Sequence, residues 1–190
     1  MNDATLVILV HQLVFQGMFL AKNIALRRKL GTSISGRNRE ARRAIAFFVF
    51  FIALSLGTGL VDDRFGSVAV LTERAALIVG LALLGATIIL GAASLSGMRD
   101  SWRVGVQENQ RTELIEKGIY RFSRNPYFLS YLIMFAAYSI LFQNAILLGL
   151  SVVGFVLIHS MVLTEERHLA AVHGDAYHRY RERVPRYLIV

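Results

Sequence analysis

Two polar segments in the C-terminal half of the chain hold residue types that could bind a charged ligand. The first contains Arg124, Asn125 and Pro126, directly before the apolar run YFLSYLIMFAAYSILF. Asn is a preferred helix N-cap and Pro a preferred first helical residue, so we expect a helix to begin at Pro126. The amide groups at such a start favour an anion, and Arg124 adds a fixed positive charge. The plainer interpretation is a capped helix with an arginine that reaches the membrane surface.

The second polar segment begins with Glu165 and Glu166, directly after another apolar run. Paired carboxylates there could neutralise an ammonium group or bind ribose hydroxyls, although a solvated helix face would show the same pattern. After a break at Gly174, Tyr177 and Tyr180 lie three residues apart on one helical face. Such tyrosines could form the wall of a cofactor pocket or anchor the chain at the membrane interface.

The elements that must position these residues are hydrophobic. The chain has 190 residues, of which 55% are hydrophobic, and its mean hydropathy is +0.50. About 20 apolar residues cross the hydrocarbon core as a helix, so we predict five spans, at 4–21, 44–61, 75–97, 127–142 and 145–163. The sequence therefore predicts an all-α integral membrane protein with a single domain, 1–190. Residues 1–98 hold three spans and their loops, and 99–190 form the catalytic region.

Composition excludes several other classes of function. The net charge of +8 would suit a nucleic-acid binder, but such a protein needs a soluble scaffold, and we expect the bilayer rather than nucleic acid as the partner. The absence of cysteine excludes disulfides, Cys-ligated zinc and thiol nucleophiles. Successive histidines at 168, 173 and 178 are five residues apart and do not share a helical face, so we expect no metal site.

The last two apolar segments are separated only by Gln143 and Asn144. Such a short polar break predicts a tight helical hairpin. The hairpin would bring its two ends, and with them the polar segments 99–128 and 164–187, to the same face of the membrane. This juxtaposition is the main structural prediction.

Lysine and arginine counts predict the orientation of the chain. All but Arg64 and Arg74 of the 21 Lys and Arg residues lie in 22–43, in 99–126 or in the C-terminal tail. By the positive-inside rule these stretches are cytoplasmic, which places the N-terminus outside and the C-terminus inside after five spans. We therefore expect an integral membrane protein with its polar segments in the cytoplasm.

Three polar residues interrupt the first span. Gln12 and Gln16 are four residues apart and share a face, and His11 is next to them. Polar groups are costly in lipid, so we expect this face to point into the bundle. There it either holds helices together or lines a path for the substrate.

The polar segments together resemble the isoprenylcysteine carboxyl methyltransferase family and its phospholipid-methyltransferase relatives. The resemblance covers about 100–188, from SWRVGV (101–106) through ELIEKGIYRFSRNPYF and a hairpin to EERHLAAVHGDAYHRYRERVPRYL. The matching residues, in chain order, are Gly118, Tyr120, Arg124, Pro126, Glu165, Glu166, Gly174, Tyr177, Tyr180, Val184, Pro185 and Arg186.

Three positions depart from the family pattern. Asn125 replaces a His, Phe128 a Tyr and His173 a Phe. Asn cannot act as a base at neutral pH, but it can donate and accept hydrogen bonds, so position 125 would bind cofactor or cap a helix. The variant looks like a bacterial branch of the family whose methyl acceptor is unknown, and this resemblance implies an integral protein of a bacterial inner membrane.

The resemblance implies S-adenosylmethionine as the methyl donor and a lipophilic acceptor that enters between the helices. Segments 112–128 and 164–186 would wrap the donor, with cofactor contacts at Leu114, Gly118, Tyr120, Asn125, Pro126, Glu165, Glu166, Tyr177 and Tyr180. A carboxylate acceptor is ionised at pH 7 and needs no base, and Arg124 or Arg103 would orient it. An amine or thiol acceptor would need a base, for which His173, Glu166 and Tyr120 are candidates.

Two other classes of function stay open. One is an NADPH-dependent membrane reductase related to sterol reductases, although the sequence has no clear clamp for a 2′-phosphate. The other is a non-enzymatic scaffold or transporter subunit, which would carry its functional polar residues inside the spans rather than at one interface. The oligomeric state does not follow from the sequence.

Overall fold

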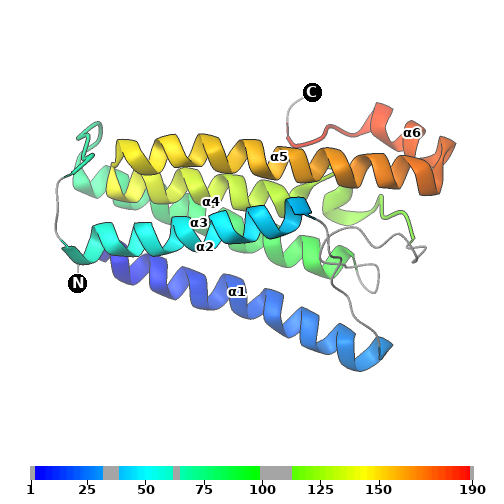
Figure 1. Cartoon of the computed structure of the whole chain (residues 1–190), viewed down its shortest axis with the longest axis horizontal. Coiled ribbons are helices and arrows are strands. Elements are labelled where there is room, and N and C mark those ends of the chain that lie inside the picture. Colours follow the sequence, from blue (N-terminus) through cyan, green and yellow to red (C-terminus); the bar gives the residue numbers. More distant parts are fainter. Residues whose placement is uncertain (1–2, 32–38, 62–64, 99–112, 189–190) are drawn as a thin grey trace.

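The computed structural model is a bundle of helices that run roughly antiparallel to one another (Figure 1). It describes residues 3–31, 39–61, 65–98 and 113–188. The long helices are α1 (Asp3–Leu30), α2 (Arg39–Val61), α3 (Glu73–Gly97), α4 (Pro126–Phe142) and α5 (Ala145–His173). A short 3₁₀ helix, η2 (Gly118–Arg121), precedes α4, and α6 (Asp175–Arg183) follows α5. Within these ranges the chain is helical apart from its connections, so the all-α prediction is confirmed.

Four of these helices, α1, α2, α3 and α5, are long and apolar enough to cross a membrane, and the 17-residue α4 is a shorter apolar helix. Each coincides with one of the five predicted spans, but several extend further. Helix α1 continues to Leu30 and α5 to His173, well past the ends predicted at 21 and 163. The charged residues that end the apolar runs do not end the helices, because Arg, Lys and Glu are good helix formers. The protein is thus an integral membrane protein.

The directions of the helices bring one set of helix ends together at one end of the bundle and another set at the opposite end (Figure 1). The end of α1, the start of α2, the end of α3, the start of α4 and the end of α5 all lie at one end, which we call the polar end. Helix α6 and the segment 113–125 also lie there. The start of α1 and the α4–α5 turn lie at the opposite end.

The predicted α4–α5 hairpin is present. Gln143 adopts a left-handed conformation (φ 45°) that ends α4, and the Asn144 side chain accepts hydrogen bonds from the amides of Ile146 and Leu147 to begin α5. The α2–α3 connection packs on this turn, since the amides of Val70 and Leu71 donate to Gln143 Oε1 at 3.0 and 2.7 Å. The turn is therefore held by its neighbours as well as by its own geometry.

The core is centred on α4, which packs against α3 and α5, and α1 and α2 also contribute buried side chains to it. Its fully buried side chains include Phe51, Met134, Phe135 and Tyr138. Helix α5 is about 44 Å long, whereas the hydrocarbon core is about 30 Å thick. Its first 20 or so residues thus suffice to cross, and Glu165 and Glu166 fall at the membrane interface.

Candidate functional site

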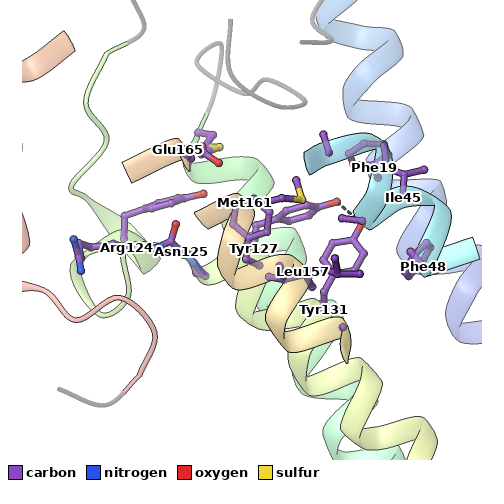
Figure 2. A pocket seen from close by; sticks show the side chains of 18 of the residues that line it. Phe19, Ile45, Phe48, Arg124, Asn125, Tyr127, Tyr131, Leu157, Met161 and Glu165 are labelled. Atoms are coloured by element: carbon purple, nitrogen blue, oxygen red, sulfur yellow. Dashed lines mark hydrogen bonds between the residues drawn. The ribbon is translucent and has the colours of Figure 1, made fainter. Parts of the chain in front are cut away.

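A cavity of about 530 Å³ opens at the polar end and continues between the membrane helices (Figure 2). Its polar part is formed by 113–115, Tyr120, Asn125, Glu165 and Tyr180. Its apolar part is formed by side chains of α1, α2, α4 and α5, among them Phe19, Phe48, Tyr131, Phe135 and Leu157. One continuous space therefore joins a charged rim to a hydrophobic interior.

The two polar segments named from the sequence are bound to each other at the rim. The amide of Arg124 donates to Pro185 O at 2.9 Å, and the Tyr180 hydroxyl donates to Tyr120 O at 2.6 Å. Ser123 Oγ donates to Arg186 O at 3.3 Å. The predicted juxtaposition of these segments is confirmed, and residues about 60 positions apart form one wall.

Glu166 is the centre of a buried ionic network rather than part of the cavity wall. Its carboxylate accepts hydrogen bonds from Arg186 Nη2 at 3.0 Å and from Asn125 Nδ2 at 2.9 Å. Arg124 Nη1 lies 3.4 Å from the same carboxylate. A buried carboxylate is costly unless charges and hydrogen bonds surround it, and here two arginines and an amide do so. Glu166 therefore joins α5, α4 and the C-terminal segment.

Asn125 occupies the N-cap position of α4, but its side chain is engaged elsewhere. The helix begins at Pro126 as predicted, with Asn125 in the N-cap position, but its side chain makes no capping hydrogen bond. Instead Nδ2 donates to Glu166 Oε1 and, at 3.2 Å, to Arg186 O. The buried carboxylate needs donors, and this demand outweighs one capping bond at a helix whose first residue is a proline.

Glu165 differs from its neighbour because adjacent residues on a helix point about 100° apart. It lines the cavity and makes no hydrogen bond or ion pair with any described residue. Figure 2 shows its carboxylate above the aromatic side chains of the cavity. A carboxylate in this position is available to a cation or to hydroxyl groups of a ligand.

Three buried tyrosines surround the rim. Tyr177 and Tyr180 pack edge to face with ring centroids 6.2 Å apart, and Tyr177 OH accepts a hydrogen bond from Arg124 Nη1 at 3.3 Å. Burial, together with the negative charge of nearby Glu165, raises the pKa of Tyr120 well above its ordinary value. Tyr120 is thus a neutral phenol at pH 7 and cannot serve as a general base there.

The structure separates the predicted site residues into two groups. Those that line the cavity are Leu114, Tyr120, Arg124, Asn125, Pro126, Glu165 and Tyr180. Gly118, Glu166 and Tyr177 lie behind this wall, and Gly118 begins η2 with a positive φ of 65° that favours glycine. The guanidinium of Arg124 points away from Tyr131 and Phe48 (Figure 2). Arg103 and the segment 101–106 lie outside the described residues.

Sequence reasoning missed most of the cavity wall that α1 and α2 form. Helix α1 contributes Gln16, Phe19, Asn23 and Arg27, spaced three or four residues apart on one face, and α2 contributes Ala41, Ala44, Ile45 and Phe48. Of these residues, Gln16 alone belongs to the polar face that the sequence suggests as a path for the substrate. The three-and-four spacing on α1 is a signal that could have identified the whole face.

The phospholipid methyltransferase family matches residues 75–176 of the chain. No curated protein matches the chain. The matched region extends from α3 to the start of α6 and includes every described residue of the polar rim except those of the last segment, from Tyr177 onward. Helices α1 and α2, which form much of the apolar wall, lie outside it. Because the match covers more than half of the chain and the helices cross a membrane, this protein belongs to the phospholipid methyltransferase family of membrane methyltransferases.

Proposed function

We propose that the protein transfers a methyl group from S-adenosylmethionine to a lipophilic acceptor held in the membrane. The observation that carries this proposal is the single cavity, which joins a polar rim to an apolar interior. A water-soluble donor and a membrane-soluble acceptor must meet in one place that excludes water, and this space provides such a place.

The residues of the rim fit the donor. Glu165, whose carboxylate has no hydrogen bond or ion pair with the described part of the chain, offers it to an amino group or to ribose hydroxyls. Tyr120 and Tyr180 offer aromatic faces to the adenine of the donor, and Leu114 offers it an apolar surface. When bound, the donor would supply a methyl group activated by its sulfonium, and transfer to a carboxylate oxygen forms an O–C bond as the C–S bond breaks.

A carboxylate is the proposed acceptor group, which would make the enzyme an O-methyltransferase. Such an acceptor is ionised at pH 7 and requires no base. This is consistent with the rim, where Tyr120 stays protonated and Glu166 is engaged by two arginines. The role of Arg124 in this proposal is to position Glu166 and Tyr177, and orienting the carboxylate would fall to Arg103 or Arg27, of which Arg27 lines the cavity.

We further propose that the whole chain acts as one domain whose polar end faces the cytoplasm. Among the described residues, Arg74 is the one Lys or Arg at the opposite end. The charge asymmetry supports this orientation by the positive-inside rule.

The test titrates the detergent-purified protein with S-adenosylhomocysteine and measures the heat of binding by isothermal titration calorimetry. We expect saturable binding in the micromolar range. NADPH in the same titration examines the reductase alternative and is expected to show no saturable heat. If NADPH binds and S-adenosylhomocysteine does not, the proposed function is wrong.

A further inference from the structure

A chain of hydrogen bonds runs through the bundle from α3 to the cavity. It consists of Thr87, His11, Tyr138, Gln12 and Gln16, and we call it the polar ladder. His11 Nε2 lies 2.7 Å from Thr87 Oγ1, and His11 Nδ1 lies 2.9 Å from Tyr138 OH. Gln12 Nε2 donates to Tyr138 OH at 2.7 Å, and Gln16 Nε2 donates to Gln12 Oε1 at 3.3 Å. The ladder connects α1, which lies outside the family match, to the matched helices α3 and α4.

The direction of every bond in the ladder follows from its first member. Thr87 Oγ1 gives its proton to Leu84 O at 2.7 Å, so it must accept a proton from His11 Nε2. His11 is buried in the bundle, where the neutral ring is favoured, so its Nδ1 accepts from the Tyr138 hydroxyl. Tyr138 OH then accepts from the Gln12 amide, and Gln12 Oε1 accepts from the Gln16 amide.

This order fixes how Gln16 meets the cavity. Its amide nitrogen is used by the ladder, and its carbonyl oxygen Oε1 makes no hydrogen bond within the described residues. Gln16 lines the cavity and is also hydrogen-bonded through its side chain to Tyr131, whose hydroxyl lies 3.1 Å from that of Tyr127. The second N–H of the Gln16 amide can donate to Tyr131, which leaves Oε1 as an acceptor. The result is a hydrogen-bond acceptor held in a set orientation on the cavity wall.

We propose that Gln16 Oε1 selects acceptors that carry an N–H or O–H donor next to their hydrocarbon chain, such as a lipophile with an amide group. This inference rests on the proposed function, because it assumes that the methyl acceptor occupies the apolar part of the cavity. A ligand without the donor leaves the carbonyl oxygen buried and unpaired, which costs binding free energy. Specificity for the acceptor thus comes from α1.

The test compares two probes that differ in one group. One is N-acetyl-S-farnesyl-cysteine, and the other is its analogue in which an ester oxygen replaces the amide N–H. Binding of each is measured by calorimetry on the protein loaded with S-adenosylhomocysteine. We expect the wild type to bind the amide about tenfold more tightly than the ester. In Gln16→Met, which keeps the side-chain length, the ratio should fall to about one through weaker amide binding.

Two further variants separate selection from packing. Phe19→Leu changes an apolar residue on the same face of α1 and should weaken both probes equally. Tyr138→Phe interrupts the ladder while leaving Gln16 in place, and it should reduce the ratio even where Gln16→Met does not fold. A wild-type ratio of one, or an unchanged ratio in both ladder variants, would overturn the inference. Failure of S-adenosylhomocysteine to bind would instead refute the proposed function.

Discussion

At the scale of single residues, the site depends on two adjacent glutamates with different surroundings. Glu166 is enclosed by Arg124, Arg186 and Asn125, whereas Glu165 faces the cavity without a partner among the described residues. Substitutions at the two positions should therefore have different consequences, one on ligand binding and the other on stability.

Glu165→Gln should weaken binding of S-adenosylhomocysteine by about tenfold or more, because a hydrogen bond to a charged group contributes about 1.5–3 kcal/mol. Thermal stability should not fall, since no described residue is hydrogen-bonded or ion-paired to this carboxylate and burial raises its pKa to about 7. Calorimetry and a thermal melt of the same preparation measure both quantities. Glu182→Gln, at an exposed position of α6, is the control and should alter neither. Unchanged affinity in Glu165→Gln would remove this residue from the cofactor site.

Asn125→Asp should destabilise the protein by about 3 kcal/mol, because it places a second carboxylate against Glu166 and removes the donor at 2.9 Å. Differential scanning calorimetry in detergent measures the loss. The matched control is Asn144→Asp at the opposite end, where a carboxylate keeps both bonds accepted from the α5 amides and favours the helix start, but loses the bond that Nδ2 donates to Phe65 O at 2.9 Å. Its loss should therefore be smaller. Equal losses in the two variants would argue against the network.

At the scale of elements, the α2, α4 and α5 contact sets the depth of the apolar part of the cavity. Gly154 of α5 lines the cavity, and a Cβ there would lie 2.6 Å from the Phe135 ring and 2.9 Å from the Phe47 ring. Glycine at this position lets the two rings from α4 and α2 approach the α5 backbone, as small residues commonly do between membrane helices.

Gly154→Ala should force both rings to shift, lower the stability by about 1–3 kcal/mol and narrow the cavity. Binding of N-acetyl-S-farnesyl-cysteine should weaken while that of S-adenosylhomocysteine is kept, which two calorimetric titrations would reveal. The control is Gly149→Ala on the exposed face of α5, where a Cβ meets nothing within 4 Å. It should be neutral or slightly stabilising, because alanine favours the helix. Equal effects of the two variants would contradict the inference that Gly154 sets the depth of the apolar part of the cavity.

At the scale of the whole molecule, charge and helix direction act together. Three connections or termini meet at the polar end, and the described cations cluster there, whereas Arg74 is at the opposite end. The site is assembled where those connections meet, so the orientation of the chain decides which compartment supplies the methyl donor.

Two reporters are fused separately after Val190. Green fluorescent protein should be fluorescent and alkaline phosphatase should be inactive, because the positive-inside rule places the polar end in the cytoplasm. Reporter activities in whole cells measure this. A fusion that ends at Gln143, one crossing earlier, should give the reverse result. Alkaline phosphatase activity from the full-length fusion would place the site on the other side of the membrane.

The sequence by itself determined the membrane helices, the hairpin and the family. Hydrophobic runs are local features, and the Gln143–Asn144 break is too short for anything but a return of the chain. The resemblance to the family also indicated where the rim lies, since its motif residues fall in two short segments, 112–128 and 164–186. The ends of α1 and α5 were set too early, because hydrophobicity ends at the membrane whereas helix propensity continues beyond it.

Only the tertiary structure decided which residue does what. Glu165 and Glu166 are equivalent in a sequence, and the contact with Asn125, 41 residues away, distinguishes them. Helix packing likewise decides that α1 and α2 contribute to the cavity. It also decides that His11 and Gln12 are hydrogen-bonded to Tyr138, more than 120 residues away. Periodicity shows which face of a helix is buried, but the partner of each polar group on that face is set by the neighbouring helices, which local pattern does not contain.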